Sequence, residues 1–383
     1  MTSSLETTPA EPLGSYSFQA HRPRFRVGDW VEVLSKEEIL RTLDSSGQYD
    51  GMPFMPEMFA FCGKRFKVYK RAHKTCDTVF PVRGRRVANA VHLETRCDGQ
   101  AHGGCQATCL IFWKEAWLKP ATSDTLEKVG NQVPGSESCG STEYNVYASA
   151  QRVDADGTIS YHCQATQLPY ASTQLEWWDI RQYVEDYRSG NVGFWRMLCG
   201  FVYSAYFAVS HAGIGLGRPM RWLYDRLRPL WGGSVFPRHS GVIPEGQPTP
   251  AHTLNLQPGE LVRIKAHTEI LETINTNNQN KGMSWDAEMV PYCGGTYRVL
   301  KRVSKLINER TGRMQEMKTP GIILDSVICQ ARYSNCRLFC PRGIYPYWRE
   351  IWLERTSQPQ SCPHQTQHPG ATTIEVPPFV DGK

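Results

Sequence analysis

The sequence predicts a mainly β protein with a helical insert, in which two tandem SH3-like small barrels arose by internal duplication. Three observations predict this class: the chain resembles itself at an offset of 231 residues, short alternating strands open and close both copies, and a helical stretch separates them. Self-similarity at a fixed offset indicates a repeated structural unit. The predicted organisation is a disordered lead at 1–23, repeat 1 at 24–120, an irregular or β connector at 121–170, a helical insert at 171–235, a linker at 236–254, repeat 2 at 255–356 and a disordered tail at 357–383.

The two copies align without a gap over residues 28–74 and 259–305, where we count 17 identities in 47 positions. The same offset pairs two cysteines of each half, and a third pair follows after a slip of one residue. A closing Trp-x-Glu-x-Trp segment matches after an insertion of four residues. The shared residues show what persisted while the two halves diverged.

Each copy begins with a turn glycine and a short strand of alternating apolar and polar residues, at 30–33 and at 261–264. Such alternation is typical of a half-buried strand. A short helix follows in the first copy, because Ser35 can cap it and Glu38 stands three residues later. A polar loop, a strand with outward cations (FKVYKR or YRVLKR) and a closing Trp-Leu strand complete each copy. This order resembles an SH3-like barrel, an analogy of fold that gives no function.

The insert contains the most apolar run of the chain, GFWRMLCGFVYSAYFAVSHAGIGLG. Arg196, His211 and five glycines interrupt this run, so it falls short of a membrane-spanning helix. A packed helix pair is the favoured interpretation. The alternatives are an interfacial amphipathic helix, in which arginines stand beside tryptophans, and a true span. Peripheral membrane contact through residues 193–231 therefore stays open.

The composition excludes several classes of protein. Hydrophobic residues make up 40% and charged residues 21% of the chain, as in a globular protein rather than a disordered polyanion or a polytopic membrane protein. The net charge of +6 is a mild excess that does not require nucleic acid. The N-terminus lacks the basic and apolar regions of a secretory signal, so we expect a cytoplasmic protein. Its 13 cysteines then favour metal binding or catalysis over disulfides.

Eight of the cysteines form two matched quartets, which are the predicted metal ligands. They are Cys62, Cys97, Cys105 and Cys109 in the first half and Cys293, Cys329, Cys336 and Cys340 in the second. Four thiolates hold tetrahedral zinc or an iron–sulfur cluster. The quartets lack the CxxC knuckles of zinc ribbons, and buried free thiols or disulfides are the alternatives. We expect about two metal centres per chain, with zinc favoured over iron–sulfur clusters.

Three residues of the first half alone, His73, Cys76 and His102, are additional candidate ligands. Surface polar residues near a metal loop are the simpler interpretation. A glutamate recurs five residues before the first cysteine of each quartet, at Glu57 and Glu288. We expect it to cap a turn or to pair with a strand arginine, rather than to act as a general base or to support a metal ligand.

Basic residues recur along the strands of both copies, where they are typical of a solvated strand face or of nucleic-acid binding. Motifs of the types GxGxxG, GxxxxGK[ST], HExxH and GxSxG are absent from the sequence. The common dinucleotide, P-loop, zincin and hydrolase classes are therefore excluded, and the sequence does not decide whether the protein is an enzyme.

The segments PFMPEMFAFCGKRFKVYKRAHKTCD, HLETRCDGQAHGGCQATCLIFWKEAWLKP and YSNCRLFCPRGIYPYWREIWLER resemble an uncharacterised bacterial family with two copies of this repeat. The resemblance covers about half of the chain and implies a bacterial cytosolic setting without a known activity. We expect a metal-binding accessory or binding protein with an unknown protein partner, in the cytoplasm or peripheral to the membrane. The alternatives are an iron–sulfur redox or electron-transfer component and a nucleic-acid-binding protein with structural zinc.

Overall fold

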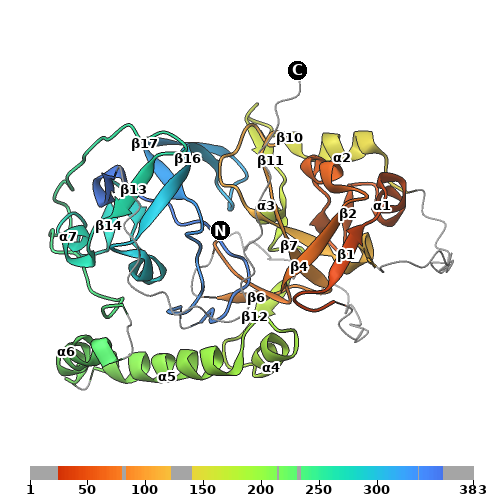
Figure 1. Cartoon of the computed structure of the whole chain (residues 1–383). Coiled ribbons are helices and arrows are strands. Elements are labelled where there is room, and N and C mark those ends of the chain that lie inside the picture. Colours follow the sequence, from red (N-terminus) through yellow and green to blue (C-terminus); the bar gives the residue numbers. More distant parts are fainter. Residues whose placement is uncertain are drawn as a thin grey trace, which may run out of the picture.

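The structure is a computed structural model that describes residues 25–79, 83–121, 140–213, 215–230, 234–334 and 336–356. Two curled antiparallel sheets lie side by side, and a layer of helices runs along one side of both (Figure 1). We refer to residues 25–121 as the first half and to residues 255–356 as the second half. The predicted disordered lead and tail lie outside the described residues, as does most of the first part of the connector.

The first half is a five-stranded antiparallel sheet in the order β8-β7-β4-β1-β9. Its strands are β1 (Trp30–Val33), β4 (Arg65–Arg71), β7 (Ala90–Arg96), β8 (Leu110–Lys114) and β9 (Leu118–Pro120). Helix α1 (Lys36–Thr42) follows β1 as predicted, because the Glu38 amide donates to the Ser35 hydroxyl while the Glu38 carboxylate accepts from the Ser35 amide.

The second half repeats four of these strands in the order β17-β16-β13-β18. They are β13 (Leu261–Ile264), β16 (Thr296–Ile307), β17 (Met314–Leu324) and β18 (Leu353–Arg355), and the short helix α7 (His267–Leu271) follows β13. The registers also correspond: Val31 pairs with Phe66 in the first half, and Val262 pairs with Tyr297 in the second. The chain is thus mainly β, with two half-barrel sheets of corresponding order.

Shorter elements connect these sheets. Three of them are strand pairs: β2 (Gln48–Tyr49) with β3 (Met52–Pro53), β10 (Gln151–Val153) with β11 (Ile159–Tyr161), and β14 (Gln279–Asn280) with β15 (Met283–Ser284). A small three-stranded sheet contains β5 (Lys74–Cys76), β6 (Gly84–Arg86) and β12 (Thr173–Leu175). The 3-10 helices are η1 (Pro56–Phe61), η2 (Glu115–Trp117), η3 (Arg228–Leu230), η4 (Ala287–Tyr292) and η5 (Glu350–Trp352).

Each half has its own aromatic core, formed by the closing tryptophans. Phe54 lies edge-on against both Trp113 and Trp117, with ring centroids 6.3 and 5.3 Å apart. The equivalent trio of the second half is Trp285, Trp348 and Trp352, with distances of 5.6 and 5.3 Å. Burial of such large side chains stabilises each sheet separately.

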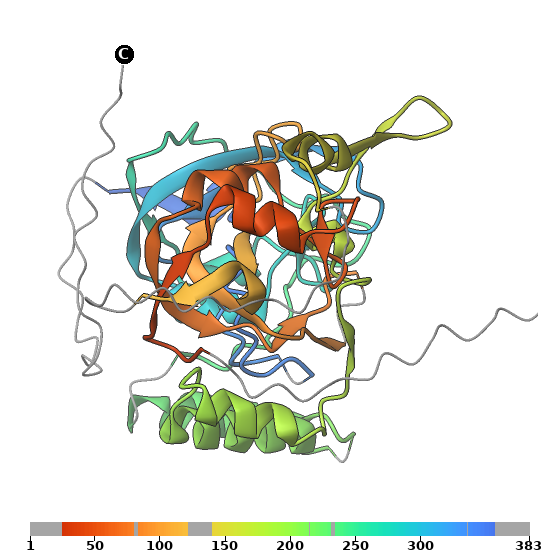
Figure 2. The same cartoon turned by 90° about the vertical axis from the view of Figure 1, so that its right-hand side faces the viewer.

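The helices of the predicted insert are α4 (Arg181–Arg188), α5 (Phe194–Ser210) and α6 (Gly217–Leu227). Two more helices, α2 (Glu143–Ser149) and α3 (Gln164–Gln167), lie in the segment for which the sequence predicts an irregular or β connector. Helices α4, α5 and α6 form the layer beneath the two sheets (Figures 1 and 2). None of the helices among the described residues is both long and apolar enough to cross a membrane.

The cysteine-rich loop of each half reaches across to the other half. The Lys305 ammonium donates to the Gly103 carbonyl oxygen at 2.9 Å, and the Lys74 ammonium donates to the Leu338 carbonyl oxygen at 2.8 Å. Lys74 and Lys305 occupy equivalent positions in the 231-residue alignment. The junction between the halves is therefore where both sets of cysteines lie.

Candidate metal centre

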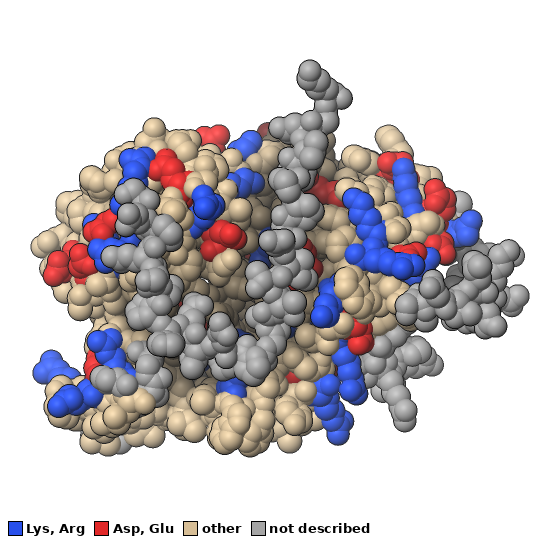
Figure 3. Space-filling model, viewed as in Figure 1, with Lys and Arg blue, Asp and Glu red and all other residues tan. Residues whose placement is uncertain are grey.

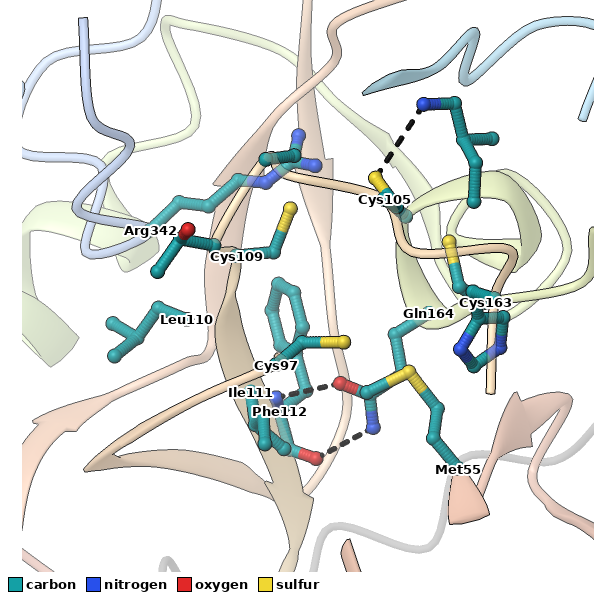
Figure 4. A pocket seen from close by; sticks show the side chains of 15 residues that line it. Met55, Cys97, Cys105, Cys109, Leu110, Ile111, Phe112, Cys163, Gln164 and Arg342 are labelled. Atoms are coloured by element: carbon teal, nitrogen blue, oxygen red, sulfur yellow. Dashed lines mark hydrogen bonds between the residues drawn. The ribbon is translucent and has the colours of Figure 1, made fainter. Parts of the chain in front are cut away.

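Four cysteines border one small cavity of about 30 Å³ in the first half. We call Cys97, Cys105, Cys109 and Cys163 the cavity group. Cys97 follows β7 and Cys109 precedes β8, Cys105 lies in the loop between these strands, and Cys163 directly precedes α3. Figure 4 shows the four sulfur atoms around the same space.

The loop that carries Cys105 is held in a tight conformation by glycines. Gly99 and Gly103 both have positive φ, at 75° and 63°. A Cβ atom at Gly99 would lie 2.1 Å from the Cys105 carbonyl oxygen, and one at Gly103 would lie 2.3 Å from the Tyr161 hydroxyl oxygen. Only glycine fits both the backbone conformation and the space, so these residues fix where Cys105 is placed.

Cys163 is held at the cavity by its neighbour Gln164. The Gln164 side chain accepts a hydrogen bond from the Phe112 amide and donates one to the Phe112 carbonyl oxygen, both at 2.8 Å (Figure 4). Strand β8 lies at the edge of its sheet, so the amide side chain satisfies backbone groups that a further strand would otherwise pair. This double hydrogen bond attaches the connector to the first half.

Three thiols of the cavity group are held in their neutral form. Burial, with a smaller contribution from neighbouring cysteines, raises the pKa of Cys97 far above its usual range, that of Cys109 to about 12 and that of Cys163 to about 11. A buried thiolate needs a nearby positive charge, which a bound metal ion supplies. These thiols therefore hold their protons tightly and lose them only when a bound cation replaces them.

A glutamate and a histidine extend this group. Glu57, from η1, accepts a hydrogen bond from His102 Nδ1 at 2.7 Å, and its Oε1 lies 3.7 Å from Cys97 Sγ. Burial raises the pKa of Glu57, but the hydrogen bond and charge of His102 lower it below its usual range. His102 Nε2 is buried and has no hydrogen-bond partner among the described residues. A carboxylate on one imidazole nitrogen is the usual support for a metal on the other.

Glu57, Cys97 and His102 are the only described group of three such side chains whose ligand atoms all lie within 4.8 Å of one another. They could hold a metal ion. The sulfur atoms of the cavity group border the cavity without three of them meeting at that distance.

A second set of cysteines lies at the junction of the halves. We call Cys76, Cys329, Cys336 and Cys340 the junction group. The Cys76 amide donates to Cys340 Sγ at 3.1 Å, and the hydrogen bond between the two side chains lowers the pKa of Cys76 and raises that of Cys340. Cys329 is close enough to interact electrostatically with both. Cys336 lies beside the β5–β6 hairpin, with its carbonyl oxygen 3.7 Å from the Cβ position of Gly84.

Arg342 lies between the two groups. Its guanidinium donates to the Cys76 carbonyl oxygen at 3.4 Å and to the Glu309 carboxylate at 2.9 Å. The charges of Glu309, Cys76 and Cys109 raise the pKa of Arg342 despite its burial. One buried cation therefore lies near Cys109 of the cavity group (Figure 4) and near Cys76 of the junction group.

Two predicted ligands lie outside the cavity lining. Neither Cys62 nor Cys293 is among the residues that border the cavity. Both end a 3-10 helix outside the two groups, so their role as ligands stays a prediction. Cys163 takes the place beside Cys97, Cys105 and Cys109 that the sequence assigns to Cys62. Sequence spacing gave no signal for Cys163, because it has no counterpart in the second copy.

The other candidates have definite partners. His73 lies against Asp186 and the Gln182 carbonyl oxygen, away from the sulfurs, and burial lowers its pKa to about 3. Cys76 joins the junction group. The expected pairing of the recurring glutamates with strand arginines is wrong, since Arg71 pairs with Glu115 and Arg302 pairs with Glu350.

The eleven described cysteines are all free, so the disulfide alternative is not supported. A scan of protein-family models finds no match to the chain, and a search of curated proteins finds no significant relative. The interpretation of the site therefore depends on its geometry alone.

Proposed function

We propose that this protein binds metal through cysteine thiolates, and that Cys97, Cys105, Cys109 and Cys163 hold an iron–sulfur cluster that makes it an electron-transfer or redox component. The observation that carries this proposal is that four sulfurs surround one buried cavity. A cluster bound there would supply a centre that accepts and returns single electrons.

The spacing of the sulfurs favours a cluster over a single zinc ion. Zinc–sulfur bonds of about 2.3 Å bring the four sulfurs of a zinc site within roughly 4 Å of each other. No three sulfurs of the cavity group lie within 4.8 Å of one another. In a [4Fe–4S] cluster each cysteine sulfur binds a different iron, so the sulfurs stand farther apart than around one zinc ion.

The surroundings of the cavity suit an anionic cluster. Apolar side chains, among them Met55 and Leu110, line it and exclude water. The Ile307 amide donates a hydrogen bond to Cys105 Sγ at 3.4 Å, and the Arg342 cation lies near Cys109. Hydrogen bonds to ligand sulfurs and a nearby positive charge both stabilise the reduced, more negative state of such a centre.

We propose a second centre at the junction group, which gives about two per chain. In each group three cysteines come from one half's own loop, and the remaining cysteine comes from elsewhere: Cys163 from the connector and Cys76 from the opposite half. The corresponding strand orders also support our proposal that the halves are duplicated SH3-like units.

Metal analysis of protein purified without oxygen tests the proposal. We expect iron and acid-labile sulfide in similar amounts, and a broad visible absorption band that dithionite bleaches. The variants C105S and C163S should each lose about half of the iron and sulfide. The matched controls C62S and C199S should keep them, because Cys62 does not line the cavity and Cys199 is exposed on α5. Colourless protein after anaerobic purification and reconstitution would contradict the cluster.

A single zinc ion is the second candidate, and His102 is the observation that favours it. Its Nε2 is buried without a partner, and Glu57 holds its Nδ1. In this case the purified protein would be colourless and carry zinc, and H102Q would lose zinc whereas H162Q would keep it. His162 is the control because it is only partly buried and lies outside the cavity lining.

A further inference from the structure

Helix α5 has an inner face that packs against the cysteine-rich loop of the second half. A Cβ atom at Gly200 would lie 2.4 Å from the Phe339 ring, so the helix and the loop are in close contact there. The rings of Tyr203 and Tyr333 lie 4.8 Å apart, and the Arg196 guanidinium donates to the Gln330 carbonyl oxygen at 3.0 Å. This face explains why the helix lies flat along the two halves (Figures 1 and 2).

The opposite face of this layer exposes large apolar side chains. They are Phe194, Trp195, Leu198, Val202 and Val209 on α5, and Leu216, Trp222, Leu223, Leu227 and Leu230 on and around α6. Trp195 is 73% exposed and Trp222 is 66% exposed. Scattered apolar residues are normal on a surface, but a continuous apolar stripe marks a site that contacts something else.

The stripe follows the period of the helix. Trp195, Leu198, Val202 and Val209 are separated by three, four and seven residues, so they share one side of α5. Helix α6 turns back at the end of α5 and continues the exposed surface with Trp222 and its neighbours. We call this combined surface the outer helical face.

The charges on this part of the chain have one dominant sign. Residues 189–244 contain six arginines, of which Arg196 and Arg238 donate to the loop of the second half, and a single acidic residue, Asp225. Asp225 is already engaged, since it pairs with His239 Nε2 at 3.1 Å and accepts from the Phe236 amide at 2.6 Å. Arg218 and Arg226 are exposed on α6. In Figure 3 the lower edge of the molecule is mostly uncharged, and basic side chains gather at its α6 end.

We propose that the outer helical face docks in the plane of a lipid bilayer whose surface carries anionic headgroups. Tryptophans prefer the boundary between headgroups and acyl chains, and arginines attract anionic lipids. An amphipathic helix with apolar residues on one side and cations beside them binds in this way without crossing the bilayer. The one acidic side chain of residues 189–244, Asp225, is already engaged. An anionic membrane therefore suits this face better than a protein surface that carries both acidic and basic groups.

Vesicle flotation tests this docking with the full chain and two probes: phosphatidylcholine vesicles, and the same vesicles with phosphatidylglycerol. We expect binding to the anionic vesicles, a blue shift of tryptophan emission on binding, and weaker binding at high salt. Since each arginine contributes about 1 kcal/mol near such a surface, R218Q/R226Q should weaken binding by roughly tenfold or more. W195S/V202S should reduce the binding that remains at high salt.

Matched controls are available on the far side of the fold. W30S removes a tryptophan that is 56% exposed on β1, and R152Q removes an exposed arginine on β10, so neither should change vesicle binding. Failure of folded protein to bind anionic vesicles would overturn the proposal. So would a dimer that W195S/V202S dissociates in the absence of lipid, because the face would then contact a second copy. Metal content in the same preparations separates this outcome from the metal proposal.

Discussion

The two halves of this protein build sheets of corresponding strand order around aromatic cores, but polar residues at aligned positions have different surroundings. Lys74 is buried beside Asp186, whereas its counterpart Lys305 is partly exposed and donates only to the Gly103 carbonyl oxygen. The insert makes this difference, because α4 packs against the first half and supplies Asp186. The aligned lysines therefore contribute differently to stability, because another element buries only one of them.

The cysteines show the same principle. Each half supplies three cysteines from its own loop, and the packing of other elements brings a further one. Cys163 arrives through the double hydrogen bond of Gln164 to β8, and Cys76 arrives because the β5–β6 hairpin meets the loop of the second half. A comparison of aligned positions therefore separates the cysteines that each half supplies from the cysteines that other elements bring to it.

The largest expected difference is between K74M and K305M. The Lys74 ammonium lies 2.5 Å from an Asp186 oxygen, and both side chains are almost fully buried. Removing one member of such a pair leaves a buried charge, so K74M should lower the free energy of unfolding by about 3–5 kcal/mol. K305M removes a partly exposed hydrogen bond and should cost less than about 1 kcal/mol. Urea denaturation of both variants measures the difference.

The double variant K74M/D186L provides the control for this comparison. Replacing both members of a buried pair with apolar side chains avoids the unpaired charge and should recover most of the lost stability. Equal losses in the free energy of unfolding for K74M and K305M would show that burial of Lys74 by the insert does not make the two positions differ.

A smaller contrast is expected between R71M and R302M, which also occupy equivalent positions. Arg71 NH1 lies 2.5 Å from Glu115, Arg71 Nε lies 2.9 Å from Glu185, and the arginine side chain is 4% exposed. Arg302 pairs only with Glu350 at 2.6 Å and is 28% exposed. We expect losses of about 3 kcal/mol for R71M and about 1 kcal/mol for R302M, measured by the same denaturation.

The reason for the smaller loss lies in the partner. Glu350 also accepts hydrogen bonds from the Leu254 and Leu256 amides, at 3.0 and 2.9 Å, so it keeps two donors after R302M. Glu115 keeps a single, longer hydrogen bond of this kind after R71M, from the Phe25 amide at 3.4 Å. A larger loss in R302M than in R71M would contradict this account.

Much of the scaffold could be predicted from the sequence because its signals are local or repeated. Alternation locates β1 and β13, Ser35 and Glu38 begin α1, and the apolar run locates α5. The analogy to SH3-like barrels and the duplication itself stay interpretations of the sequence. The helices of the insert and the strands of the two sheets can be predicted from the period at which apolar residues recur over short stretches of sequence.

The composition of the cysteine groups could not be predicted in this way. Cys62 aligned with Cys293 and completed a regular quartet, yet Cys163 and not Cys62 borders the cavity with Cys97, Cys105 and Cys109. The position of Cys163 depends on Gln164 reaching the edge of β8, a contact across 52 residues that no local pattern expresses. Tertiary contacts of single side chains decide such sites.

Acid should affect the first half through a histidine that the second half lacks. His92 pairs with Lys70 across β7 and β4, and Ile323 takes the equivalent place opposite Lys301. Burial lowers the pKa of His92 to about 4, and its Nδ1 hydrogen-bonds to the Ile111 carbonyl oxygen at 2.8 Å. In the unfolded chain its pKa is about 6.5. The unfolded state therefore binds more protons between these values, and stability falls as the pH drops through this window.

H92I tests this difference by giving the first half the residue of the second. Wild-type protein should lose about 2 kcal/mol more than H92I between pH 7 and pH 5, measured as denaturation midpoints at each pH. At pH 7 the variant should be slightly less stable, because the Ile111 carbonyl oxygen loses its donor. Parallel pH profiles for the two proteins would rule out His92 as the source of acid sensitivity.

The smallest expected effect concerns the first turn after the opening strand. Ser35 caps α1 with its hydroxyl, while the equivalent residue before α7 is Ala266, which has no side chain that can accept a hydrogen bond. The carboxylates of Glu38 and Glu269 reach back to the cap amide in both helices, each at 2.8 Å. The halves therefore differ by one hydroxyl group.

Exchanging the two cap residues isolates that group. S35A should lose about 1 kcal/mol of stability, because the Glu38 amide then lacks its acceptor. A266S should gain up to a similar amount, since its backbone is already extended, with φ of −63° and ψ of 150°, close to the −62° and 159° of Ser35. Thermal unfolding of both variants measures these shifts, which should have opposite signs. A loss in A266S would mean that the second half's turn, although it has the same backbone, cannot turn a serine hydroxyl toward the helix.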